Sequence, residues 1–127
     1  MNKQIHKYAA LQHKKIAEEK DSEMQKEREI NKKIALRTVA AQNYFYAGVH
    51  AIESIFAVKD LHSYSHKNRH DKIIENPGII SKGLFKIFDS VDRDLRNKVG
   101  YRGENGEKYI KLKEFCDLAV GEMEKNE

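Results

Sequence analysis

Apolar residues recur at steps of three and four along most of the chain, which is the spacing of one face of an α-helix. The first stripe of this kind predicts a helix over residues 3–20, with a helical face made of Ile5, Tyr8, Ala9, Ala10 and Ile16. A longer helix is expected over 23–58, with Asp21-Ser22 as its N-cap. Its end, residues 44–58, is almost wholly apolar, so we expect this half of the helix to form the centre of the core.

Two further helices are predicted in the second half of the chain. Residues 59–71 are rich in Ser, Asn, Asp and His, which favour bonds to their own backbone, and predict a loop or a short irregular helix. Pro77-Gly78 marks a break, after which apolar positions predict a core helix over 79–99. A glycine-rich connection leads to a last helix over 107–124. We find no alternating strand pattern, so the expected fold is an all-α bundle of four to five helices in one domain, residues 1–127.

The composition is typical of a soluble helical protein. The chain has one proline and no tryptophan, and its single cysteine, Cys116, excludes an internal disulfide, which fits a reducing cytoplasm. No window approaches about 18 consecutive apolar residues, and the first residues lack the apolar segment of a signal peptide. We therefore expect an unprocessed cytoplasmic protein with no membrane association.

Positive charge is concentrated in the middle of the chain. Residues 59–113 carry thirteen Lys or Arg against eight Asp or Glu, a net charge of +5. Residues 1–36 carry +3 and residues 114–127 carry −4. A positive segment can bind the phosphates of RNA or DNA, although lysine-rich helices are also common as plain solvated surfaces.

Three histidines, His62, His66 and His70, are spaced four residues apart, so on one regular helix they would share a face at a spacing suited to a transition metal. The intervening Ser63 and Asn68 disfavour a regular helix there. We therefore predict neither a metal site nor a cofactor.

Polar side chains inside the most apolar helix are candidates for function. His50 can be a buried neutral imidazole satisfied by a neighbouring helix, or a catalytic base. Asn43 and Tyr46 are candidate substrate-binding residues, with the alternatives of a buried amide that ties helices together and a core ring whose hydroxyl reaches the surface.

A cluster near the end of the 79–99 helix can bind a phosphate. Arg96 and Asn97 are candidate catalytic residues together with Tyr101, and Lys98 and Arg102 are candidate substrate-binding residues. The alternative is that Arg96 is only a terminal charge, because cations are favoured at the C-terminal end of a helix.

These segments together resemble the HEPN superfamily of small all-α domains, which are found beside nucleotidyltransferases in toxin–antitoxin pairs and in RNA-cutting defence proteins. The resemblance covers residues 36–120 and leaves 1–35 as a charged N-terminal helical extension. It rests on three blocks: Ala41–Ser54, with its Tyr-Ala and His-Ala pairs; Ser65-His66-Lys67; and Leu95–Tyr101, where the family has its signature arginine.

The resemblance implies a dimer that presents the arginine motif to RNA or a nucleotide. Ribonuclease members end the motif in histidine and cleave RNA without metal, whereas this chain resembles a branch with tyrosine, here Tyr101. In that reading Arg96 holds a phosphate, Asn97 orients a hydroxyl or the arginine, and Tyr101 donates a hydrogen bond or stacks. If the protein cleaves RNA as a metal-independent ribonuclease or toxin, the candidate base is His50 or one of His62, His66 and His70.

The alternative is a non-catalytic interaction module, paired with a partner protein such as a nucleotidyltransferase-like antitoxin. A purely structural bundle is a third reading.

Overall fold

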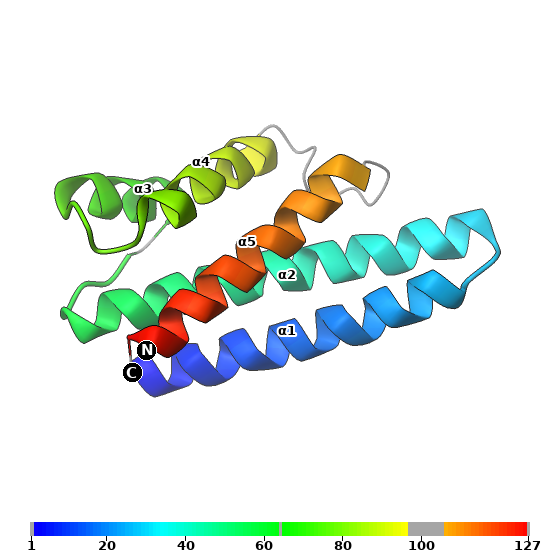
Figure 1. Ribbon diagram of the computed structural model, residues 1–127, viewed down its shortest axis with the longest axis horizontal. Helices are drawn as coiled ribbons and strands as arrows, with labels where there is room; N and C mark the ends of the chain where they lie inside the picture. Colours follow the sequence, from blue (N-terminus) through cyan, green and yellow to red (C-terminus); the bar gives the residue numbers. More distant parts are fainter. Residues whose placement is uncertain (1, 64, 97–105, 127) are drawn as a thin grey trace.

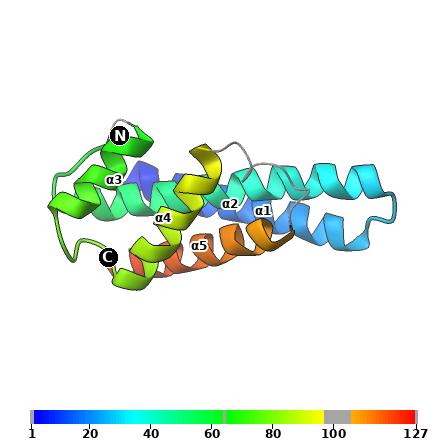
Figure 2. The same ribbon diagram turned by 90° about the horizontal axis from the view of Figure 1, so that it is seen from above.

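A computed structural model describes residues 2–63, 65–96 and 106–126, without the side chains of His66, Leu95 and Arg96. It confirms an all-α bundle: the described residues form five helices and no strand. The helices are α1 (Lys3–Lys26), α2 (Ile30–Val58), α3 (His66–Glu75), α4 (Lys82–Arg96) and α5 (Gly106–Lys125). α1 and α2 form a long antiparallel hairpin, α5 crosses it obliquely, and α3 and α4 lie together beyond α5 and α2 (Figures 1 and 2).

The buried face of α1 differs from the predicted one. Ala10 is buried, but Ile5 and Tyr8 are 49% and 64% exposed. The side chains that face α2 recur every seven residues, as in a coiled coil, and alanines dominate them because they let two helices approach closely. Fully buried alanines seven residues apart are Ala10 and Ala17 on α1 and Ala40 and Ala47 on α2.

The first helix continues past the predicted N-cap, so Asp21-Ser22 does not start α2. Instead, Asp21 lies inside α1 and accepts a hydrogen bond of 2.6 Å from the hydroxyl of Tyr109 on α5. α1 ends at Lys26, and the turn to α2 follows it. Glu29 is the N-cap of α2, and its carboxylate accepts from the backbone N–H groups of Asn31 and Lys32. A cap that binds these N–H groups satisfies donors that have no partner inside the helix.

The C-terminal half of α2 is the centre of the core, as predicted. Phe45, Ile52 and Phe56 are each at most 1% exposed. α5 approaches this half so closely that a Cβ atom added at Gly48 would lie 2.2 Å from Cε2 of Phe115. Glycine at this position therefore makes the contact between the two helices possible.

The polar segment after α2 forms a more regular helix than expected. Ser65 is the N-cap of α3 and accepts from the backbone N–H of Asn68 at 3.1 Å, which explains why a serine-rich sequence begins a helix here. α4 begins three residues later than predicted, because Ser81 caps it by accepting from the N–H of Leu84. Its apolar face, which includes Phe88, is buried as predicted.

All five helices contribute to one hydrophobic core. α1 supplies Ala10, α3 supplies Ile73 and α4 supplies Phe88, beside the larger shares of α2 and α5. Residues 1–35 are thus packed into the core of residues 36–120. Across the part of the chain that the structure describes, no helix has an apolar stretch long enough to cross a bilayer.

Candidate functional site

The arginine motif begins at Arg96, which is the last described residue of α4. Asn97, Lys98, Tyr101 and Arg102 lie outside the described residues, so the predicted phosphate cluster can be located only through its first member and its neighbours on α4 and α5.

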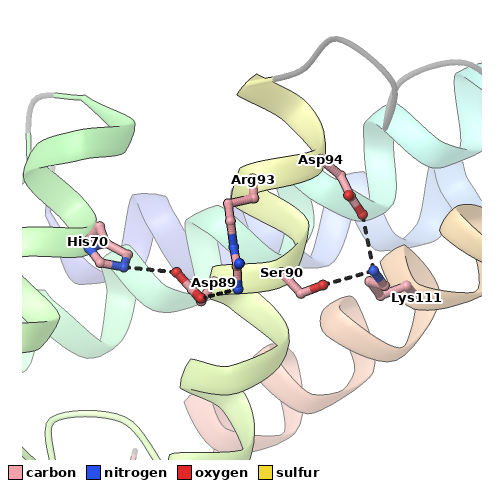
Figure 3. Close-up of polar contacts among 6 residues, drawn as sticks. All are labelled: His70, Asp89, Ser90, Arg93, Asp94 and Lys111. Carbon is pink, nitrogen blue, oxygen red and sulfur yellow. Dashed lines mark hydrogen bonds and ion pairs between the residues drawn. The ribbon is translucent and has the colours of Figure 1, made fainter.

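The carboxylate of Asp89 on α4 binds two side chains, one from α4 and one from α3 (Figure 3). Asp89 accepts from Nη2 of Arg93 at 2.7 Å, one turn further along α4. Its other oxygen lies 3.0 Å from Nε2 of His70, which comes from α3. The Arg93 side chain is 67% exposed, so its guanidinium remains open to solvent although one nitrogen is held.

A second carboxylate joins α4 to the start of α5. Asp94 accepts from Nζ of Lys108 at 2.6 Å. It also accepts from Nζ of Lys111 at 3.1 Å, and Lys111 donates to the hydroxyl of Ser90 as well (Figure 3). Burial acts to raise the pKa of Asp94, but the hydrogen bonds from the two lysines outweigh it, and the pKa lies below its usual value. Asp94 therefore stays charged and fixes α5 beside the end of α4.

A separate group of side chains lies on the contact between α1 and α2. Nδ1 of His6 lies 3.0 Å from Nδ1 of His50. The ring of His13 stacks on that of His50, with centroids 5.5 Å apart and an interplanar angle of 8°. Of the predicted site residues, His50, Asn43 and Tyr46 are thus brought into one row with two histidines of α1.

The His6–His50 contact sets the tautomers of both rings. Two neutral imidazoles can share such a contact only if one Nδ1 carries the proton and the other accepts it. Burial is the main cause that lowers the pKa of both rings, and it brings that of His50 to about 4. At neutral pH the pair is therefore uncharged, with one protonated and one unprotonated Nε2.

Asn43 and Tyr46 differ in their contacts with His13 and in their exposure to solvent. The Asn43 amide is engaged within the bundle, since Oδ1 lies 2.9 Å from Nδ1 of His13 and Nδ2 donates to the carbonyl of Val39. Tyr46 is 43% exposed, and its ring lies 5.5 Å from that of His13. Asn43 therefore ties α1 to α2, and Tyr46 presents a surface ring.

A pocket opens beside the His6–His50 pair, between the start of α1, the second half of α2 and α3. Its volume is about 420 Å³. Val49 gives it an apolar side, and its polar lining consists of His6, His50, Glu53, His62, Ser63 and Arg69.

The lining of the pocket includes an ion pair that is largely withdrawn from solvent. Nε of Arg69 donates to Oε1 of Glu53 at 2.8 Å, and the side chains are 11% and 7% exposed. The Ser63 hydroxyl donates to the same oxygen. Among the described residues, Nη1 of Arg69 is enclosed without an acceptor.

The three evenly spaced histidines do not share a helix face. His62 precedes α3 and lines the pocket, while His70 lies on α3 and binds Asp89. In the described parts of the chain, no group of three or more His, Cys, Asp or Glu side chains is arranged to hold a metal ion.

Sequence reasoning missed His6, His13, Glu53 and Arg69 as members of these clusters. For the two histidines a signal existed: they stand seven residues apart and follow the seven-residue spacing of the buried face of α1.

Comparison with known proteins gave no match. No family model matches the chain, and neither a curated protein nor a solved structure does so. The HEPN resemblance stays a prediction from the sequence blocks.

Proposed function

We propose that this protein is a HEPN-like domain that binds RNA or a nucleotide through phosphates at the C-terminal end of α4. The observation that supports this most directly is the exposed guanidinium of Arg93, which stands one helical turn before Arg96. Positions three apart on a helix are neighbours, so the end of α4 carries two arginines at adjacent positions. Guanidinium groups bind phosphate oxygens in pairs of parallel hydrogen bonds.

The neighbouring carboxylates hold cationic side chains in place beside the end of α4. Asp89 holds one terminal nitrogen of Arg93 and leaves its other N–H groups for a ligand. Asp94 fixes Lys108 and Lys111 at the start of α5. In the proposal, Arg96 binds the central phosphate, and Tyr101 stacks on or donates to the nucleotide.

Binding without efficient cleavage is the activity that the chemistry favours. A phenol has a pKa of about 10 and is a poor base at neutral pH, which applies to Tyr101. His50 is also a weak base, because burial lowers its pKa to about 4. We therefore place the function in recognition of RNA or a nucleotide by a homodimer.

The test is a fluorescence-anisotropy titration of a labelled single-stranded RNA with the wild type, Arg96→Ala and Arg28→Ala. Arg28 is an exposed arginine in the turn between α1 and α2 and serves as the charge-matched control. Loss of a charge-assisted phosphate contact should weaken binding about tenfold or more in Arg96→Ala and reduce the salt dependence by about one ion. Equal effects of the two substitutions would contradict the proposed site.

A second candidate function is supported by the outer face of α1. Ile5, Tyr8, Leu11 and Ile16 are between 37% and 64% exposed, which is unusual for so many large apolar side chains on one helix. We infer from this a binding face for a protein partner of the nucleotidyltransferase-like kind. Co-purification with the product of the neighbouring open reading frame, lost in Tyr8→Glu and kept in Lys15→Glu, is the expected result.

A further inference from the structure

The end of the α1–α2 hairpin that contains the turn extends beyond the helices that cover the rest of the hairpin (Figures 1 and 2). α5 meets the hairpin where Tyr109 binds Asp21 and where a Cβ atom added at Gly106 would lie 3.9 Å from Nη1 of Arg37. Past this level, no other described helix lies beside α1 and α2. The end of the hairpin therefore has a face that no other described helix covers.

A groove between the two helices lies at this end of the hairpin. Its volume is about 550 Å³. Ala35, Leu36 and Val39 of α2 form its apolar side, and Val39 is 40% exposed. Single exposed apolar side chains are common, but neighbouring ones that line a groove favour a surface that a partner covers.

Charged side chains of both signs border the groove. Lys20 and Glu23 bind each other at 3.2 Å along α1. Glu27, at the end of α1, and Lys32, in the first turn of α2, also line the groove. In the described part of the chain, neither Glu27 nor Lys32 takes part in an ion pair. The groove thus has an unpaired anion on its α1 edge and an unpaired cation on its α2 edge.

This pattern is complementary to itself. A two-fold axis parallel to the hairpin places α1 of one copy over α2 of another copy, at the same level along the hairpin. The contacts of His6 with His50 and of His13 with Asn43 fix that level, and they put position 32 across from position 24, between Glu23 and Glu27. Lys32 of each copy then faces Glu27 of the other copy.

We propose that a second copy of this chain fills the groove, so that two hairpin ends pack as a four-helix bundle about this axis. Leu36 and Val39 of both copies form the centre, and two Glu27–Lys32 pairs close the edges. Neighbouring helices run antiparallel in this arrangement, as in up-down four-helix bundles. The inference rests on the proposed function in one respect, because it assigns a surface to the homodimer named there.

The contact is small, because it is confined to the end of the hairpin. Small interfaces form weak and reversible complexes, so we expect the proportion of dimer to rise with protein concentration. Charge should control such a contact, since like charges that face each other across an interface oppose association.

The experiment is sedimentation equilibrium of the full chain at concentrations up to about 1 mM, where even a weak dimer is populated. Glu27→Lys and Lys32→Glu should each weaken the wild-type dimer about tenfold or more, because each places like charges at both edges. An equimolar mixture of the two variants should associate as the wild type does, because the mixed dimer again pairs opposite charges at both edges.

Lys26→Glu is the matched control. It makes the same change of charge at an exposed position beside Glu27 that does not line the groove, and it should dimerise as the wild type does. Circular dichroism shows whether each variant keeps its fold. If a charge variant misfolds, Val39→Asp tests the same groove, because it puts a charge on the apolar side and should prevent the dimer.

The outcomes separate this inference from the proposed phosphate site. A chain that stays monomeric refutes the inference, as does a dimer that the groove substitutions leave intact or a mixture that fails to associate. If the chain is monomeric and Arg96→Ala still weakens RNA binding, the phosphate site stands without this dimer. If the mixture associates while Arg96→Ala leaves RNA binding unchanged, the groove is supported and the phosphate site fails.

Discussion

Replacement of Gly48 by alanine tests how tightly α2 and α5 are packed. Two effects oppose each other. Alanine is favoured over glycine inside a helix by about 1 kcal/mol. Against this, the new Cβ would lie 2.2 Å from Cε2 and 2.6 Å from Cζ of Phe115, far inside van der Waals contact. Overpacking of this kind costs about 1–3 kcal/mol, and more where the neighbour cannot move.

Phe115 has little room to yield. It is fully buried, and its ring centroid lies 6.1 Å from that of Phe45 and 5.9 Å from that of Phe88. We therefore take the upper part of the range and expect Gly48→Ala to lower the free energy of unfolding by about 2 kcal/mol after the gain in helix propensity.

Urea titrations followed by circular dichroism at 222 nm measure this change. Gly121→Ala is the matched control, because Gly121 lies on the exposed side of α5 with no atom within 4 Å of the added Cβ. That variant should gain about 0.5–1 kcal/mol. Adding Phe115→Leu to Gly48→Ala should cost less than Phe115→Leu does alone, because the smaller side chain relieves the overlap. If Gly48→Ala were as stable as the control, the close contact between α2 and α5 would be wrong.

Three further changes in stability follow from the structure. Lowering the pH from 6.5 to 5 should reduce the free energy of unfolding by about 1–2 kcal/mol, because the unfolded chain, with histidine pKa values near 6.5, binds protons that the folded His6 and His50 resist. Urea titrations at the two pH values should show that the fall in the free energy of unfolding shrinks by half or more in His50→Gln. An unchanged fall would mean that other groups cause it. Glu53→Ala should cost about 3–5 kcal/mol in the same assay, because it leaves the Arg69 charge buried without its partner, and a cost under about 1 kcal/mol would show that water reaches the pair. Glu29→Ala should cost about 0.5–1 kcal/mol through loss of the α2 cap, and a neutral result would show that water replaces it.

The sequence predicted helices best where the buried side chains are large. The apolar end of α2 and the stripe of α4 consist of residues such as Phe56 and Phe88, whose burial dominates the packing. The face of α1 was misjudged because its buried residues are alanines, which carry a weak signal beside exposed Ile5 and Tyr8. The seven-residue spacing of the buried positions indicated which face of α1 packs on α2, but alanine side chains are too small to stand out in the hydrophobic pattern.

The candidate site was only partly predictable, for a different reason. Arg96 could be assigned to the end of a helix from local periodicity. The partner of His50 is His6, 44 residues earlier, and this pairing depends on how two antiparallel helices are aligned. Glu53 and Arg69 likewise meet only because α3 folds back toward α2. Such contacts are properties of tertiary structure and leave little trace in local sequence.

The alanine-lined contact between α1 and α2 has a consequence for how uniquely the hairpin pairs. Because small residues recur every seven positions on both helices, sliding one helix by two turns would again match alanine with alanine. Polar contacts break this ambiguity, since His13 meets Asn43 and the Ser54 hydroxyl reaches the carbonyl of Lys3 in one alignment alone. These bonds thus select a single alignment of the two helices, and their removal would yield a protein that is still helical but mixed in its pairing.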